Sequence, residues 1–528
     1  MKKGTKSCLA IALILVLLCV AAAALVVIRD ICPPAGPWPQ PPWCDGSEQA
    51  FLPGQPGTTP LAESPRLSLT VRVPENTPDH TVVYVELSDE NGVVFMSEAM
   101  TRSTGNVWTY ASTDMDWQME NRGAVHYRYV RDNLGYWAAE EFDPDSPDTF
   151  RTITSGSGTE IHDTVAQWRW MSTPGDNPPQ VTARLEPFAP RINAEAFQQG
   201  MLHADWWWDA FEPLIPSTNA RMLEHGITWV ELSPTWDYTQ VDPTPVLSNQ
   251  VGHAYPDDKL RLHIEALQAS GFEVFFLPQI CCTEVDPDLQ TPEWWDTWFE
   301  QYRNFLLYHV DLANEYGIEY ISLTSDWQVY VDKPEGYVER MDAIYDEAQA
   351  RYDGKMGMNF IIFRNPTEGR YFLSPYEGWV PELERWDFLG FSWWAGISSS
   401  PDPTPEELDQ NVEAVFRTVL QPMYAQYGVP LIFTQVSITS VDGCLMGEVN
   451  VFDPAIQLWE PYADKFELDL EEQAMGYDAI LRGIARHDYV IGMYPFAYLP
   501  DTFPLTLEFN VRDKPAEQVL RQWYETIP

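Results

Sequence analysis

The last two-thirds of the chain alternate short apolar segments with amphipathic segments, and this alternation restricts the fold more than any other feature. The apolar segments run from "FQQGMLHADWWW" through "GITWVELSP", "FEVFFLPQI", "IEYISLTSD", "KMGMNFIIF", "WDFLGFSWW" and "GVPLIFTQV" to "YVIGMYPFAY". Helical patterns such as "DDKLRLHIEALQASG" separate them. Strand and helix alternating eight times predict a (β/α)8 TIM barrel over residues 191–528. Because 190 residues precede this barrel, we expect a multidomain protein.

Residues 66–170 have a different rhythm. Short segments such as "LSLTVRV", "TVVYVEL" and "AVHYRYVR" alternate apolar and polar residues with a period of two, and turn sequences such as "RSTGN" separate them. This pattern predicts an antiparallel β-sandwich. Residues 171–190, which include "STPGDNPPQ", are expected to link the sandwich to the barrel.

The N-terminal residues 1–30 read as a signal-anchor or transmembrane helix. Three lysines precede an uncharged apolar run from Cys8 to Ile28, about the 20 residues that cross a bilayer. The lysines favour a cytoplasmic N-terminus and export of the rest. The alanines Ala21–Ala24 also resemble a signal-peptidase site, so the run is either a retained anchor or a cleaved signal. Residues 31–65 are Pro-rich and predict a stiff spacer, which places the protein at the extracellular face of the membrane or in the medium.

The charge of the chain excludes some partners. Acidic residues outnumber basic ones 78 to 32, for a formal net charge of −46. Nucleic acids and anionic lipid surfaces need a basic footprint, so neither is an expected ligand. No Cys/His spacing fits a zinc site, and we expect no metal and no cofactor.

The chemistry of such a barrel belongs at the C-terminal ends of its strands. Those ends carry the acids Glu231, Glu284, Asp286 and Asp326 and the amide Gln435. They also carry the aromatic and amide residues Trp207, Trp236, Tyr238, Gln279, Trp327, Trp393, Trp394 and Tyr494. Rings that stack on sugar faces, beside polar groups that bond hydroxyls, indicate a polysaccharide or oligosaccharide ligand.

Several segments resemble glycoside hydrolase family 113, a clan A family of barrel enzymes that act on β-mannan. The segment "TPEWWDTWFEQYRNFLLYHVDLANEYGIEYISLTSDW" resembles its third helix and fourth strand, and "GITWVELSPTW" and "GVPLIFTQVSITS" resemble its second and seventh strands. In clan A the fourth strand ends on an acid/base glutamate and the seventh on a nucleophilic glutamate. The resemblance therefore places Asp326 at the acid/base position and Gln435 at the nucleophile position.

These two replacements leave three accounts open. Retaining hydrolysis needs two carboxyl groups about 5–5.5 Å apart, and an amide cannot form the glycosyl ester. The barrel either binds glycan without cleaving it, or pairs Asp326 with a base such as Glu284, Asp286 or Glu231 across the wider gap of about 6.5–9.5 Å that inversion tolerates. In the third account the substrate supplies its own nucleophile, such as an N-acetyl group that Gln435 orients.

The run "VHYRYVRDNLGYWAAEEFDPDSPDTFRTIT" resembles a starch-binding domain of carbohydrate-binding module family 20. In that family a strand like "HYRYVR" precedes a tryptophan that stacks on the sugar. The resemblance gives this role to Trp137 and makes the sandwich a second carbohydrate-binding region.

Overall fold

The computed structural model divides into two compact units, one formed mainly by the chain up to Arg169 and the other by the chain from Trp170. It describes residues 67–89, 92–112, 125–142, 150–153, 159–172, 179–192, 197–203, 209–250, 254–280, 283, 285–323, 334–364, 369–374, 383–447 and 466–527. The predicted anchor and spacer lie outside these residues. Within the described ranges no helix is both long enough and apolar enough to cross a bilayer.

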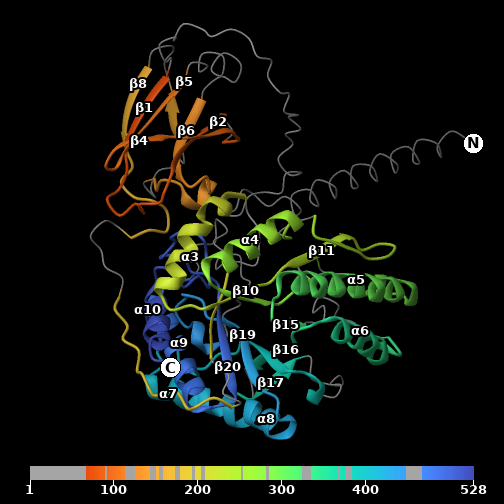
Figure 1. Cartoon of the computed structure of the whole chain (residues 1–528). Coiled ribbons are helices and arrows are strands. Elements are labelled where there is room, and N and C mark those ends of the chain that lie inside the picture. Colours follow the sequence, from red (N-terminus) through yellow and green to blue (C-terminus); the bar gives the residue numbers. More distant parts are fainter. Residues whose placement is uncertain are drawn as a thin grey trace, which may run out of the picture. The chain divides into compact units, whose positions relative to one another are not determined.

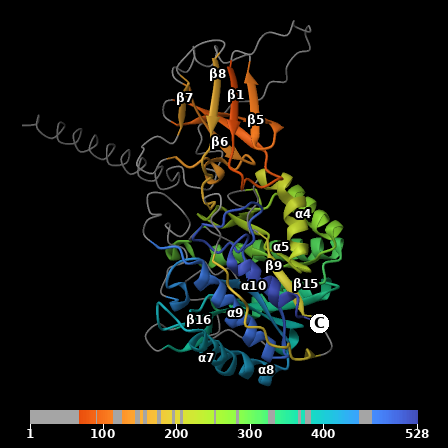
Figure 2. The same ribbon diagram turned by 90° about the vertical axis from the view of Figure 1, so that its left-hand side faces the viewer.

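The N-terminal unit contains two four-stranded sheets, with strand orders β4-β5-β1-β8 and β3-β2-β6-β7 (Figure 2). Its strands are β1 (Leu67–Arg72), β2 (Val83–Ser88), β3 (Val94–Ala99), β4 (Thr101–Thr104), β5 (Val107–Ser112), β6 (Val125–Arg131), β7 (Arg151–Ile153) and β8 (Thr159–Thr164). The period-two pattern is visible in β1, where Leu67, Leu69 and Val71 are buried and the residues between them are not. A β-rich unit is confirmed, although β1 and β8 pair in parallel where an antiparallel sandwich was predicted.

The second unit contains the predicted barrel. Its eight parallel strands follow one another around the barrel in chain order, and the pairing of the last strand with the first closes it. They are β9 (Gln198–Leu202), β10 (Trp229–Leu232), β13 (Glu273–Phe276), β15 (Tyr320–Leu323), β16 (Lys355–Arg364), β18 (Phe388–Trp393), β19 (Leu431–Ser437) and β20 (Val490–Phe496). Each lies in one of the eight apolar segments named above.

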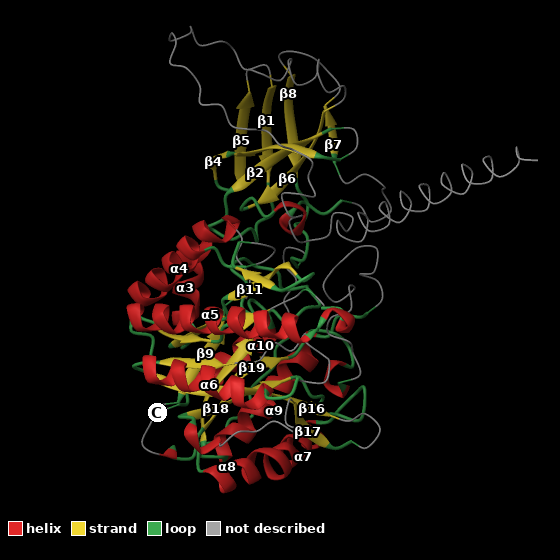
Figure 3. Ribbon diagram, turned by 90° about the vertical axis from the view of Figure 1, so that its right-hand side faces the viewer, coloured by secondary structure: helices red, strands yellow, loops and turns green. Residues whose placement is uncertain are grey.

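Helices surround the barrel (Figures 1 and 3). They are α3 (Ile215–Glu224), α4 (Asp257–Ser270), α5 (Pro292–Tyr316), α6 (Tyr337–Arg351), α7 (Pro405–Val415), α8 (Gln421–Tyr427), α9 (Leu470–Arg486) and α10 (Pro515–Tyr524). Local sequence sets their ends. The hydroxyl of Thr291 accepts from Trp294 N at the start of α5, and Gly317 ends that helix in the left-handed conformation, with φ 64°.

Short strands extend the barrel at one end. They are β11 (Thr235–Gln240), β12 (Val246–Ser248), β14 (Gln279–Ile280) and β17 (Tyr371–Ser374). β17 pairs antiparallel with β16, which at ten residues is the longest barrel strand. In the described residues between β16 and β18 this hairpin and a 3-10 turn, Leu383–Arg385, stand where a regular barrel has a helix.

Aromatic side chains fill the lower part of the barrel interior, meaning the part nearer the N-terminal ends of most strands. Phe275 lies 5.0 Å from Tyr494 and 5.7 Å from Phe388, measured between ring centroids. Their strands, β13, β20 and β18, are not neighbours in the sheet, so these contacts cross the barrel axis. Together with Tyr320 and Ile432 these residues form a buried cluster that we call the aromatic layer.

Candidate functional site

Four successive strands place small polar side chains inside the barrel near their C-terminal ends. Asn359 Nδ2 donates to Ser392 Oγ at 2.9 Å, and the Thr434 hydroxyl donates to Asn359 Oδ1 at 2.5 Å. The Ser392 hydroxyl donates in turn to Gln435 Oε1 at 3.2 Å. These residues are all buried, as is Ser322 on β15. We call Ser322, Asn359, Ser392, Thr434 and Gln435 the polar layer.

A bulge between β18 and β19 brings two consecutive residues of β19 into the polar layer. The step of two positions from Gly390 to Ser392 on β18 is paired with a step of three positions on β19, from Ile432 to Gln435. Bulges of this kind re-aim side chains and are frequent next to active sites. Gly390 supplies the space, because a Cβ there would lie 2.7 Å from Asn359 Oδ1 and 2.9 Å from Ser322 Oγ.

The hydrogen bonds of the layer fix the orientation of the Gln435 amide. Asn359 Oδ1 accepts from Thr434, so its Nδ2 faces Ser392. Ser392 Oγ accepts from that Nδ2, which leaves its own hydrogen to donate to Gln435 Oε1. Among the described residues Nε2 of Gln435 makes no hydrogen bond, and 6% of the residue's surface is exposed. Gln435 therefore offers amide donors, and it has no carboxylate to act as a nucleophile.

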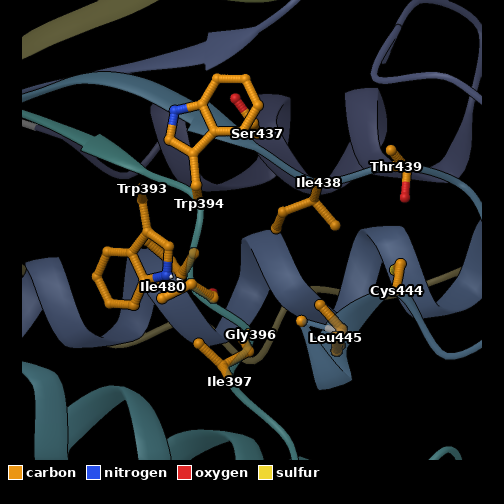
Figure 4. A pocket seen from close by; sticks show the side chains of 12 residues that line it. Trp393, Trp394, Gly396, Ile397, Ser437, Ile438, Thr439, Cys444, Leu445 and Ile480 are labelled. Carbon is orange, nitrogen blue, oxygen red and sulfur yellow. Dashed lines mark hydrogen bonds between the residues drawn. The ribbon is translucent and has the colours of Figure 1, made fainter. Parts of the chain in front are cut away.

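The ends of β18 and β19 also form a small pocket beside the polar layer (Figure 4). It is lined by Trp393, Trp394, Ala395, Gly396, Ile397, Ser437, Ile438, Thr439, Cys444, Leu445, Gly447 and Ile480. The Trp394 ring, half-buried, lies 5.9 Å from the Phe509 ring and 6.4 Å from that of Phe496. The pocket holds about 30 Å³ for water-sized molecules, room for one or two waters and too little for a sugar ring in this conformation.

Two buried charged groups hold the loops around this pocket. Glu472 on α9 accepts from Gly443 N at 2.6 Å and from Leu445 N at 3.0 Å, and burial raises the pKa of Glu472 to about 7. Lys514 Nζ donates to Ser440 Oγ at 2.8 Å and to two backbone carbonyls after β20. Burial lowers the pKa of Lys514 to about 8. The loops after β19 and β20 are thus fixed from within.

Three acids beside these loops have the geometry to hold a cation. Oxygens of Asp442, Asp469 and Glu472 all lie within 4.8 Å of one another. Asp469 Oδ1 already caps α9 by accepting from Glu471 N and Glu472 N, and Glu472 binds the two backbone amides named above. Structural hydrogen bonds therefore account for the carboxylates of Asp469 and Glu472.

The comparisons with known proteins concern the barrel. A family model described as Glycoside Hydrolase Family 113 matches residues 216–504, more than half of the chain. The chain belongs to glycoside hydrolase family 113. This confirms the resemblance predicted for the barrel, whereas the resemblance of the sandwich to a starch-binding domain found no support. No curated protein matches the chain.

Solved structures of glycosidases, two of them from family 113, resemble this chain. The β-mannanase AaManA from Alicyclobacillus acidocaldarius, in complex with ManMIm, is 18% identical, with a TM-score of 0.47 over 63% of this chain and 98% of that one. A complex structure of a GH113 β-1,4-mannanase is 18% identical, with a TM-score of 0.45 over 62% and 99%. A Bifidobacterium dentium β-glucuronidase complexed with coumarin-3-O-glucuronide is 12% identical, with a TM-score of 0.38 over 86% and 62%.

Several residues predicted for the site of this family 113 protein are not among those described. Asp326 and Trp327 follow β15, Trp207 follows β9, and Glu284 follows β14, and all four lie outside the described residues. Their roles stay predictions.

The other two predicted acids do not stand at the polar layer. Glu231 on β10 has 0% of its surface exposed, and its Oε1 accepts from Ser233 Oγ at 3.2 Å. It lies near the aromatic layer, where its charge adds to burial in raising the pKa of Tyr494. Asp286 is exposed and caps a 3-10 turn by accepting from Asp288 N at 2.9 Å. Glu231 is thus enclosed in the barrel, and its role as a base stays a prediction.

The aromatic residues predicted after the second strand pack on a helix. The Trp236 ring lies 5.6 Å from that of Phe305 and 5.4 Å from that of Tyr308, both on α5. The Tyr238 hydroxyl accepts from Trp298 Nε1 at 3.0 Å on the same helix, and Tyr238 is 7% exposed. Residues two apart on a strand share a face, and here that face covers α5, with Trp236 half-buried and Tyr238 buried against the helix.

The third strand's predicted amide has a different environment. Gln279 is half-buried in β14, beside Thr235 of β11. Between the two aromatic residues of β11, Asp237 Oδ1 accepts from Thr283 N at 3.3 Å and from Tyr238 N at 2.7 Å. Asp237 therefore ties the ends of the second and third strands together.

Trp393 and Tyr494 are core residues, which corrects their prediction as sugar contacts. The Trp393 ring lies 5.4 Å from that of Phe433, and its Nε1 donates to Ala395 O at 3.0 Å. Figure 4 shows it beside Ile480, whereas the ring of the next residue lies beside Ser437. Tyr494 belongs to the aromatic layer, and its hydroxyl donates to Gln198 Oε1 at 2.8 Å.

Trp137, predicted to stack on a sugar, is 2% exposed. It lies in a short 3-10 turn, Gly135–Ala138, after β6. A ring that the protein encloses on all sides has no face left for a ligand, so this prediction is also wrong for the structure as it stands.

Asn359 and Thr434 are absent from the residues predicted for the site. A signal for the first was present, because Asn359 interrupts the apolar run "KMGMNFIIF". A buried amide needs hydrogen-bond partners, and in a barrel strand they come from neighbouring strands inside the barrel. No comparable signal marked Thr434, whose inward position depends on the bulge.

Proposed function

We propose that this protein binds a polysaccharide or oligosaccharide, of β-mannan type by its family, in the mouth of the barrel and does not cleave it by double displacement. The observation that carries this proposal is the hydrogen bond from Ser392 to Oε1 of Gln435 at the end of the seventh barrel strand. A retaining glycosidase needs a carboxylate there, whereas an oriented amide can bond a sugar hydroxyl through Nε2.

The environment of Gln435 supports binding over catalysis. Its neighbours Ser392, Asn359 and Thr434 are neutral hydrogen-bonding groups, and together they satisfy one another. Such a network holds a side chain in one orientation and needs no charge to do so. Glu231 is enclosed in the barrel and Asp286 is exposed and caps a turn, so neither stands at the polar layer as the predicted base for inversion.

We place this activity outside the cell. Lysines before the apolar run from Cys8 to Ile28 support export of the remaining chain, and the Pro-rich residues 31–65 support a spacer between the membrane and the folded units. A surface-tethered barrel would hold polymer against the cell.

The experiment compares binding with cleavage on one polymer. The full-length protein in detergent micelles should sediment with insoluble β-1,4-mannan and release no reducing ends. Its Gln435→Glu variant should fold equally well, and gain of retaining hydrolysis would mark an inactivated glycosidase site.

Two results would overturn the proposal. Absence of the wild-type protein from the pellets of mannan and of other β-linked polysaccharides would reject carbohydrate binding. Release of reducing ends by the wild-type protein, lost in Asp326→Asn, would show that Asp326 works with a partner other than Gln435, and the protein would be a hydrolase.

A further inference from the structure

The hairpin of β16 and β17 rises from the rim of the barrel, on the same strand that carries Asn359. β16 pairs with β15 along its first four residues, from Lys355 to Met358, and with β17 along its last four, from Ile361 to Arg364. The hairpin therefore stands above the end of β15, the fourth barrel strand. Figure 3 shows β17 beside β16.

The alternation of side chains along β16 shows which face of the hairpin looks toward the barrel axis. Met358, Phe360 and Ile362 pack in the large core that includes the surrounding helices. Asn359 lies on the opposite face and bonds inside the barrel. Side chains two apart share a face, so Phe363 lies on the face of Asn359, above the polar layer.

Phe363 forms an aromatic pair on this face with Phe372, its cross-strand partner. The two ring centroids are 5.8 Å apart and the planes differ by 28°, a stacked arrangement. Phe363 is 36% exposed and Phe372 43%. The other exposed large apolar residues of the described chain are aliphatic, namely Val82, Val93, Leu185, Leu223, Val246 and Leu468. Exposing two adjacent aromatic rings forgoes the stabilisation that burial gives, which points to a ligand.

The protein holds this hairpin in place. The Tyr371 hydroxyl donates to Gly396 O at 3.1 Å, and Arg364 Nη1 donates to Ser398 O. Ile362 and Leu373, which pair within the hairpin, are buried on its other face. Gly396 also lines the pocket of Figure 4, so the aromatic pair and the pocket are attached to the same segment.

The register gives the distance of the pair from Gln435. Ile361 pairs with Ser392, whose hydroxyl binds Gln435. Phe363 lies two residues further along β16, which is about 7 Å at the usual strand rise, and β16 lies two strands from the β19 strand of Gln435, about 10 Å across the sheet. The pair is therefore further from Gln435 than one sugar unit, but within reach of the same extended polysaccharide.

We propose that Phe363 and Phe372 form a stacking platform for a sugar ring of the bound chain, a few units along the chain from the ring that Gln435 contacts. This inference rests on the proposed function and deepens it, because it makes the ligand a chain of several sugar units. The flat, apolar faces of pyranose rings suit such a platform, and the hydroxyls at their edges stay in water.

The test compares ligands of two lengths. The full-length protein should bind mannohexaose more tightly than mannobiose in calorimetry. The variant with Phe363→Ala and Phe372→Ala should lose about tenfold in affinity for the hexaose and little for the biose. Phe372→Tyr, which keeps a ring, should bind the hexaose like the wild type. Leu223→Ala on α3, which removes another exposed apolar side chain, is the matched control and should change neither affinity.

Each contrary result has a distinct meaning. Equal affinity of the wild type for both lengths, or an unchanged hexaose affinity in the double alanine variant, would reject the platform and leave glycan binding intact. Failure of the wild type to bind either oligosaccharide would reject both proposals. If the wild type sedimented as a dimer and the double alanine variant as a monomer, with sugar affinity unchanged, the aromatic pair would be a protein interface.

Discussion

The aromatic layer and the polar layer of the barrel share several strands, on which they lie only a few residues apart, and they contribute differently to stability and to the site. In the lower layer Phe275, Phe388 and Tyr494 meet across the axis and fill the interior. In the upper layer Asn359 and Thr434 meet across the position of Gly390, which has no side chain. The aromatic layer consists mainly of large apolar rings, and the polar layer consists of amide and hydroxyl side chains.

The difference teaches how a barrel can change its chemistry without losing its fold. Stability comes chiefly from buried apolar surface, which the aromatic layer and the helix-covered core supply. In the polar layer Asn359, Ser392 and Thr434 bond one another, and hydrogen bonds of this kind contribute less net stability. A change of residue type at position 435 should therefore be tolerated by the fold, because the residues that determine the fold lie elsewhere.

The largest expected effect is in the aromatic layer. Phe388→Ala removes a ring with 0% exposure that contacts Phe275 and Tyr320, and it should lower the free energy of unfolding by about 3–5 kcal/mol. Thermal unfolding monitored by circular dichroism measures this. Binding of mannan per folded molecule should not change. If binding fell as strongly as stability, the two layers would not be independent.

The second-largest effect is a loss of folding stability at acidic pH. Burial lowers the pKa of His263 and of His309 to about 3, well below the value near 6.5 of an unfolded chain. The unfolded state then binds more protons between pH 6.5 and pH 3, so stability is complete above pH 6.5 and falls as the pH drops. Each histidine should cost about 2–3 kcal/mol of unfolding free energy at pH 4.5.

The polar layer should not follow this pH dependence, because its amides and hydroxyls do not titrate. We expect mannan binding per folded molecule to be constant from pH 4.5 to 6.5, where the histidines reduce stability, measured by sedimentation with the polymer. Urea unfolding from pH 4 to 7 measures the stability. His309→Leu should reduce the slope of unfolding free energy against pH by about 1.4 kcal/mol per pH unit, and an unchanged slope would contradict the assignment to this residue.

The smallest effect separates two serines of the polar layer. Ser392→Ala removes the hydroxyl that orients Gln435, and it should cost about 0.5–1.5 kcal/mol in stability and weaken mannan binding a few-fold. Ser322→Ala is the matched control, because Ser322 Oγ is buried and makes no hydrogen bond within the described chain. It should leave both properties nearly unchanged. Equal losses in the two variants would show that the Ser392 hydrogen bond does not position Gln435.

Much of the fold could be predicted from the sequence, because strand and helix patterns are local. The eight apolar segments became the eight barrel strands, and Gln435 lies at the end of the seventh of them as predicted. The prediction that Gln435 stands at the family's nucleophile position also came from the sequence, since it needs only a residue type and a strand end.

The orientation of individual side chains was decided by tertiary structure. Trp236 and Tyr238 face α5, and Trp393 faces the helical layer, because each strand turns one of its two faces to the helices. Strand pattern alone assigns residues to two faces and does not say which face looks toward the mouth.

The polar layer shows the same division between sequence and tertiary structure. Sequence determined that β19 ends on an amide and that β16 carries Asn359 within an apolar run. Only the folded barrel, through the bulge in β19 and the missing side chain of Gly390, brings Thr434 and Asn359 together and turns Gln435 toward Ser392. The physical reason is that these contacts join strands distant in the chain, and register and curvature emerge only when the barrel closes.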